Sequence, residues 1–110
     1  MITVTFHKTK SGEYKSFTCS GHAGIDVNGK DIVCASISVL VINTINSLEE
    51  IVQEKIMVDT DEESGLIVCK FVEPLQEKSK VLIDSLILGL SQIEKQYGKK
   101  YCKLKFEFTD

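Results

Sequence analysis

Tryptophan is absent from this chain of 110 residues, proline occurs once, and neither sign of charge dominates. The net charge of -3 argues against a strongly electrostatic nucleic-acid binder, which would usually be basic, but it does not exclude a basic protein as partner. We find no apolar run of the ~20 residues needed to cross a bilayer. The first residues also lack the basic and apolar regions of a signal peptide. We therefore expect a cytoplasmic protein that binds neither membranes nor nucleic acid directly.

Four cysteines are present, and in the cytoplasm they should be reduced thiols. Cys19, Cys69 and Cys102 each stand in a strand-like segment beside apolar neighbours, so we expect them to be buried core residues. Cys34 has two interpretations at this point, a small buried hydrophobe or a reactive thiol. The chain length fits one domain over 1–110, and 43% apolar residues can supply its core.

Hydrophobic periodicity indicates seven elements in the order ββαββαβ. Period-two alternation or short apolar runs predict strands at 2–7, 14–19, 56–58, 66–72 and 102–109, and helical spacing predicts helices at 31–52 and 75–97. We expect an α+β two-layer sandwich, with the two helices packed on a mixed or antiparallel sheet. The strand at 66–72 is apolar on both faces and should be central. Pro74 suits a helix start and Gly98 a helix stop.

The first half of the predicted helix at 31–52 is apolar nearly all round, so it must be buried on most sides. One small sheet cannot cover such a helix alone. We therefore expect part of its surface to meet a second copy of the chain. A polar acidic turn, 59–65, follows the next strand and is most simply a solvated turn.

The stretch from Gly21 to Ser38 starts as a glycine-rich loop and ends as a helix. Asp31 is either the N-cap of that helix or an acid in its first turn, and Cys34 would then lie in the first turn. Unpaired backbone N–H groups and the positive end of the helix dipole favour a thiolate there. Ser38, one turn further on the same face, is small enough to leave room for a substrate backbone.

His22 lies upstream in the loop, where it can fold back over the helix start and serve Cys34 as a base. Asp31 or Asp26 can orient this histidine, although a cap is the ordinary role of Asp31. Cys19 and His22 have the spacing of zinc ligands and Cys34 can add a third, but the second close pair of ligands typical of structural zinc is missing. The glycines also form no phosphate loop, because Asp31 follows Gly29-Lys30. We expect no metal and no cofactor.

The motifs Gly21-His22-Ala23 and Asp31-Ile32-Val33-Cys34-Ala35, with Ser38 beyond them, resemble the ribosomal-processing cysteine protease family, Prp, also called YsxB-like. The resemblance covers the whole chain. It implies a homodimeric bacterial enzyme that removes the N-terminal extension of a large-subunit ribosomal protein, number twenty-seven. It also implies that Cys34 is the nucleophile and His22 the general base, with Asp31 and Ser38 at the family's motif positions. A loop containing Gly21, Ala23, Gly24 and Gly29 would close over the substrate.

Two functions of different classes follow. The first is a cysteine endopeptidase acting on a ribosomal protein. The second is a non-enzymatic, ribosome-associated module that grips a peptide with its loop, in which Cys34 is merely buried. Reactivity of the Cys34 thiol separates the two, because only the enzyme needs that sulfur to be accessible and nucleophilic.

Overall fold

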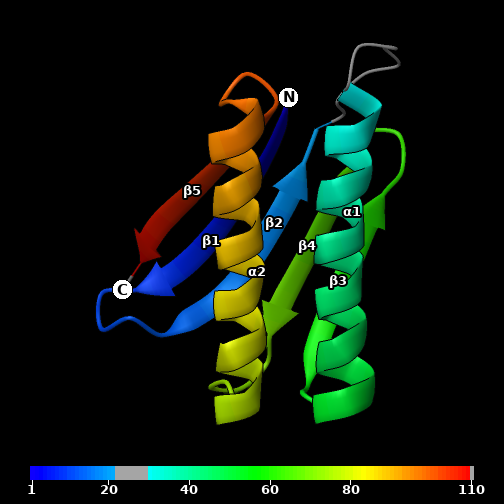
Figure 1. Cartoon of the computed structure of the whole chain (residues 1–110). Coiled ribbons are helices and arrows are strands. Elements are labelled where there is room, and N and C mark those ends of the chain that lie inside the picture. Colours follow the sequence, from blue (N-terminus) through cyan, green and yellow to red (C-terminus); the bar gives the residue numbers. More distant parts are fainter. Residues whose placement is uncertain (22–29, 110) are drawn as a thin grey trace.

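The computed structural model of the protein describes residues 1–21 and 30–109. It contains five strands and two long helices, and Figure 1 shows both helices on the same face of the sheet. In chain order the elements are β1 Ile2–Thr9, β2 Tyr14–Ser20, α1 Lys30–Ser47, the short π-helical segment η1 Leu48–Val52, β3 Ile56–Asp61, β4 Leu66–Phe71, α2 Glu77–Tyr97 and β5 Cys102–Thr109. The predicted α+β class, element order and two-layer arrangement are confirmed.

The sheet is mixed, with strand order β3-β4-β2-β1-β5. Neighbouring strands are antiparallel except β1 and β5, which run parallel. The predicted central place of β4 is wrong in detail, because β2 occupies the middle of the sheet and β4 lies between β2 and the edge strand β3. Strands β2 and β4 each have two neighbouring strands. An apolar run indicates that a strand is in the interior of a sheet, but it does not indicate which interior position the strand takes.

One hydrophobic core lies between the sheet and the two helices. Alternate residues of β1 and β2 point toward the helices, and Phe6 and Phe17 lie opposite each other with ring centroids 5.5 Å apart. The two helices approach closely, since a Cβ placed on Gly89 of α2 would lie 3.0 Å from Leu40 of α1. The fully buried members of the core include Val4, Phe6, Phe17, Val33, Ile37, Val41, Ile83, Leu86 and Leu90.

The first helix and its neighbours differ from prediction at their ends. Helix α1 begins at Lys30, and its predicted last turns form the π-helical segment η1, which ends beside Gln53 in the left-handed region (φ 61°). Strand β3 continues through Asp61, so residues 59–61 of the predicted acidic turn 59–65 are strand. Helix α2 begins at Glu77, and Pro74 therefore lies before the helix and not in its first turn. Gly98 ends α2 as expected, with φ 96°.

The late start of α2 is explained by a buried carboxylate from another part of the chain. The Glu54 side chain is 7% exposed, and its Oε1 accepts hydrogen bonds from the Gln76 N–H (3.0 Å) and the Ser79 hydroxyl (2.6 Å). Burial by itself would raise the pKa of Glu54, but these hydrogen bonds and backbone N–H donors outweigh it and lower that pKa. Glu54 thus caps α2 where the Gln76 side chain makes no capping bond.

The segment Ile32–Val52 is, by length and composition alone, apolar enough to cross a membrane. The expectation that no apolar run reaches this length was therefore wrong, because Glu49 and Glu50 come only near the end of the run. In the folded chain the helix packs through Val33, Ile37 and Val41 against the sheet. Only 33% of this apolar stretch is buried, so the predicted burial on most sides is not met within a single chain.

Candidate active site

Cys34 is the fifth residue of α1 and is partly exposed, whereas the other three thiols are buried. Because the helix begins at Lys30, Cys34 lies at the start of the second turn and not in the first, as the sequence had suggested. Side chains on a helix lean toward its N-terminus, so a side chain at this position covers the turn that carries the unpaired N–H groups. At this position the thiol is still near the positive end of the helix dipole.

A cavity of about 370 Å³ opens beside Cys34, between α1 and the adjacent ends of four strands. Cys34 and Ser38 lie on its helical wall, one turn apart, as their spacing predicted. Gly21, directly after β2, also lines the cavity, as do the end of β3 and the β3–β4 turn. The described lining residues are Ile2, Cys19, Gly21, Cys34, Ser38, Ile42, Thr60, Asp61, Glu62, Gly65, Leu66 and Ile67.

Gly21 is required for a structural reason at the edge of this cavity. Its φ is +103°, a conformation that other residues rarely adopt, and a Cβ at this position would collide with the Met1 carbonyl oxygen. The end of β2 therefore lies tightly against the start of β1.

Several predicted site residues lie outside the described part of the chain. They are His22, Ala23, Gly24 and Gly29, together with Asp26, the alternative orienting acid. Asp31 is the second residue of α1, which is the first-turn position and not the cap that flanks the helix. Of the predicted catalytic pair, Cys34 thus lies within the described residues, and the role of His22 is a question for experiment.

Burial separates the three remaining thiols from Cys34, as predicted. Burial raises the pKa of Cys69 to about 12 and of Cys102 to about 11. Burial also raises the pKa of Cys19 to about 11, and the nearby thiols of Cys102 and Cys34 add to this effect. Cys19 shares the cavity with Cys34, but a thiol held neutral in this way is a poor nucleophile.

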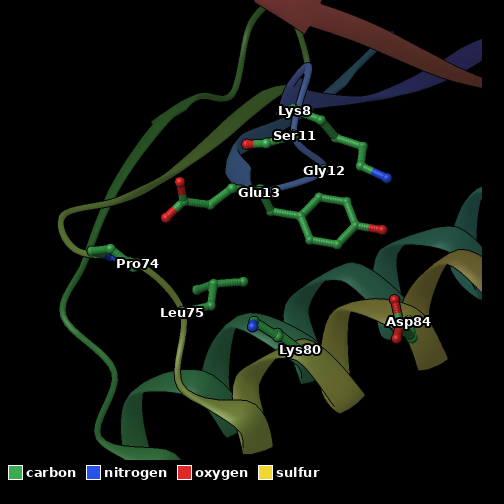
Figure 2. Close-up of a pocket in the computed structure, with 9 residues that line it drawn as sticks. Lys8, Ser11, Gly12, Glu13, Pro74, Leu75, Lys80 and Asp84 are labelled. Carbon is green, nitrogen blue, oxygen red and sulfur yellow. The ribbon is translucent and has the colours of Figure 1, made fainter. Parts of the chain in front are cut away.

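A larger cavity, of about 510 Å³, lies at the other end of the helices, between the β1–β2 turn and the start of α2 (Figure 2). Burial raises the pKa of Tyr14 there, and the Asp84 carboxylate, which accepts its hydrogen bond, raises it further. The Lys8 ammonium lies 4.8 Å from the centre of the Tyr14 ring. The described residues that line this larger cavity include neither cysteine nor histidine, so the thiol chemistry belongs to the smaller cavity.

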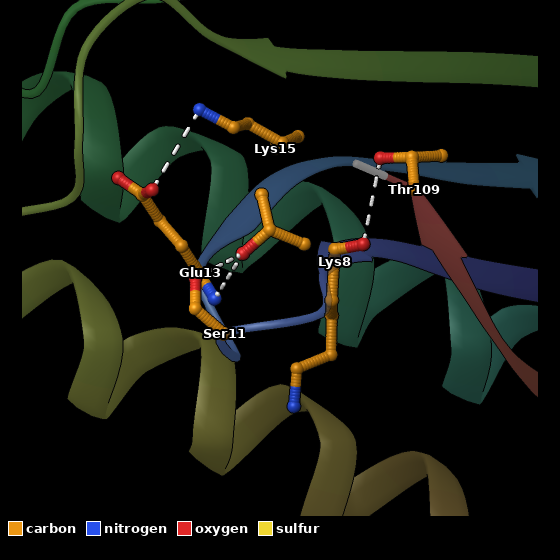
Figure 3. A network of polar contacts seen from close by, with 6 residues as sticks. Lys8, Ser11, Glu13, Lys15 and Thr109 are labelled. Carbon is orange, nitrogen blue, oxygen red and sulfur yellow. Dashed lines mark hydrogen bonds and ion pairs between the residues drawn. The ribbon is translucent and has the colours of Figure 1, made fainter.

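Polar contacts hold the β1–β2 turn beside that larger cavity (Figure 3). The Thr9 hydroxyl oxygen accepts the Glu13 N–H at 3.0 Å and lies 2.8 Å from the Ser11 hydroxyl. The Lys15 ammonium lies 3.7 Å from the Glu13 carboxylate. These contacts explain the form of the turn and supply no catalytic group.

His7, the other histidine of the chain, lies on β1 and contacts β5. Its Nδ1 lies 3.5 Å from Glu107 Oε2, across the parallel pair of β1 and β5. Ile2, which lines the Cys34 cavity, is five residues away along β1, or about 16 Å at the rise of a strand. His7 is therefore remote from the thiol, which leaves His22 as the histidine close to Cys34 in sequence.

The end of β3 and the β3–β4 turn also line the cavity, which was not predicted from the sequence. Thr60, Asp61, Glu62 and Gly65 line it, although the segment looked like a solvated turn. Nothing in the local sequence marks these residues. They reach the site because the strand order brings the end of the β3–β4 hairpin next to the start of α1.

An α+β domain with a partly exposed thiol near a helix start, beside a cavity, has the arrangement that a thiol hydrolase requires. The family model described as "Cysteine protease Prp" matches residues 1–103, and the chain belongs to this family. It is therefore a cysteine protease. Of the two functions drawn from the sequence, the family supports the enzyme and not the non-catalytic module.

Individual relatives agree with this assignment. The Ribosomal processing cysteine protease Prp of Bacillus subtilis is 29% identical over 101 residues, covering 88% of this chain and 90% of the relative. Its namesake from Staphylococcus aureus is 24% identical over 99 residues, covering 90% and 93%. A crystal structure of a Streptococcus mutans protein superposes with a TM-score of 0.86 at 27% identity, covering 99% of each chain. The S. aureus protease, solved with a substrate peptide, shares the fold with a TM-score of 0.88 at 22% identity, covering 97% and 100%.

Proposed function

We propose that this protein removes the N-terminal extension of the large-subunit ribosomal protein number twenty-seven, with Cys34 as nucleophile and His22 as general base. The observation that carries the proposal is the position of Cys34, the one partly exposed thiol of the four, on the wall of a cavity near a helix start. The names of the relatives as ribosomal processing proteases support this class of substrate. The resemblance of the motifs around His22 and Cys34 supports the choice of residues.

The proposed reaction follows the usual course of thiol proteases. His22 accepts the proton of the Cys34 thiol, and the sulfur attacks the carbonyl carbon of the scissile peptide bond. The carbon–nitrogen bond then breaks, and the leaving amine takes the proton back from His22. A water molecule, deprotonated by His22, finally hydrolyses the thioester and regenerates the Cys34 thiol.

Backbone groups of the first turn of α1 are suited to stabilise the oxyanion. In a helix that begins at Lys30, the N–H of Cys34 itself has an intrahelical acceptor, so the unpaired donors lie upstream, at residues 30–32. Asp31 is in this same turn and is one candidate to orient His22, the other being Asp26. Ser38 lines the cavity one turn beyond Cys34, where its small side chain leaves space for the peptide backbone.

We further propose a homodimer that forms through the outer surface of α1. Ile32, Val39 and Ile42 are 60%, 65% and 48% exposed, and their spacings of seven and three residues place them on one stripe of the helix. Exposed apolar stripes of this kind are typical of helix pairing. The resemblance to a homodimeric family supports a second copy of the chain as the partner.

Introducing a charge into this stripe is expected to separate the dimer. Val39→Lys should weaken self-association at least about tenfold, because a lysine at an apolar interface must be desolvated without a partner. Light scattering coupled to size-exclusion chromatography measures the mass. The control is Val81→Lys on α2, which is 67% exposed and lies off the stripe. A wild-type chain that stays monomeric at all concentrations would refute the dimer.

Thiol alkylation tests whether Cys34 is reactive in the native protein. At about pH 8, the raised pKa values of Cys19, Cys69 and Cys102 leave roughly one thiolate in a thousand or fewer at those sites. We expect iodoacetamide to label Cys34 first, by at least about tenfold, and the others only above about pH 10 or after unfolding. Peptide mapping by mass spectrometry locates the label. An inert Cys34 beside labelled neighbours would favour the non-catalytic module instead.

A further inference from the structure

The cavity beside Cys34 has an uneven distribution of charge. Among its described lining residues, Asp61 and Glu62 are the only charged side chains, and both are exposed. Asp61 is the last residue of β3, and Glu62 follows it in the β3–β4 turn. A positively charged group that enters this cavity therefore meets two carboxylates in the same space as the Cys34 thiol.

The remaining lining is largely apolar. Ile42 of α1, Leu66 and Ile67 of β4, and Ile2 at the start of β1 supply apolar side chains to the lining. The cavity, at about 370 Å³, is large enough for one or two side chains of a bound peptide. It can thus receive an apolar side chain of a peptide while a neighbouring side chain meets Asp61 and Glu62.

The acidic turn has a defined form. Asp61 Oδ1 accepts the Glu63 N–H at 3.1 Å, which is a local bond typical of an aspartate at a turn. Gly65 completes the turn with φ 66°, in the left-handed region. The backbone that presents Asp61 and Glu62 is therefore held by contacts of its own, so their charges can be removed without removing the turn.

We propose that Asp61 and Glu62 are specificity-determining residues that select a lysine or arginine side chain of the substrate, next to an apolar residue seated in the cavity. This inference rests on the proposed function, because it requires a peptide bound across Cys34. The two carboxylates attract a basic side chain over a distance of several ångströms. They repel an acidic one, and this discrimination weakens as salt screens the charges.

The test uses the extension peptide of the ribosomal protein from the same organism, in a series that carries lysine, glutamine or glutamate at each position flanking the scissile bond. For the wild-type protein, we expect kcat/KM at one position to be about fivefold higher for lysine than for glutamine, and lower again for glutamate. The double variant Asp61→Asn/Glu62→Gln should lose this preference. It keeps the side-chain shapes and the oxygen that accepts the Glu63 N–H.

Asp59→Asn is the matched control, since Asp59 is an exposed acid of the same strand that does not line the cavity. It should keep the wild-type preference, and raising the salt to about 1 M should reduce the preference of the wild type itself. Peptide binding to Cys34→Ala, measured by fluorescence anisotropy, gives a readout that does not need catalysis. A wild-type protein that cleaves all members of the series equally overturns the specificity and leaves the protease proposal intact. A protein that neither binds nor cleaves any of them overturns both.

Discussion

Replacing Cys34 with alanine is expected to reduce kcat/KM for the extended ribosomal protein by about 10⁴-fold or more. The alanine removes the atom that forms the thioester, and no neighbouring group can replace it. Cys19 shares the cavity, but burial raises the pKa of its thiol to about 11, which keeps it protonated under the conditions of the assay. Quantitative mass spectrometry of the cleaved extension measures the rate.

The matched control for this variant is Cys69→Ala, because Cys69 is a fully buried thiol in the interior strand β4 and does not line the cavity. It should lose about 1 kcal/mol of unfolding free energy and keep its cleavage rate, since the deleted sulfur leaves only a small void. Thermal melts of both variants show whether the fold survives. Full activity in a folded Cys34→Ala protein would exclude this residue as the nucleophile.

Replacing His22 with alanine is expected to reduce kcat/KM by about 10³-fold or more, because proton transfer to and from the sulfur then depends on water. The chain has two histidines, so His7→Ala provides the control for loss of an imidazole. His7 pairs with Glu107 on strands β1 and β5, and its removal should leave cleavage near the wild-type rate.

A histidine that acts as base has two signatures that a structural histidine does not share. The pH dependence of kcat/KM should lose its lower limb in His22→Ala, and added imidazole should restore part of the rate by supplying a diffusible base. If His22→Ala kept the wild-type rate and pH profile, the base would have to be another group. The oxyanion donors that we propose in the first turn of α1 are unchanged in this variant, so some residual cleavage is expected.

The sequence predicted the elements of this fold because each buries one face with a regular period. Leu86 and Leu90 on α2 recur at helical spacing, and Val4 and Phe6 on β1 alternate, so both elements were predicted correctly. The ends were harder to predict. Pro74 suggested an earlier start for α2, but the capping carboxylate of Glu54 comes from a distant part of the chain and places the start at Glu77.

In the candidate site too, the sequence predicts what depends on neighbouring residues and not what depends on contacts between distant parts of the chain. The relation of Cys34 to Ser38 follows from helical spacing alone, and the structure confirms that both line one cavity. The presence of Asp61 and Glu62 in the cavity could not be predicted, because it depends on which strand lies next to which and on the close approach of a hairpin to α1. An acidic turn has the same local sequence whether it faces solvent or a binding cavity.

The most direct test is to incubate the purified protein with a peptide copied from the ribosomal-protein extension of its own organism, and to follow both molecules by mass spectrometry after rapid quenching. We expect a single cut in the peptide and a transient mass increase on the Cys34-containing fragment, equal to the acyl portion of the substrate. An intact peptide after prolonged incubation, or an acyl group found only on another residue, would contradict the assignment of Cys34 as the nucleophile of a ribosomal-protein processing protease.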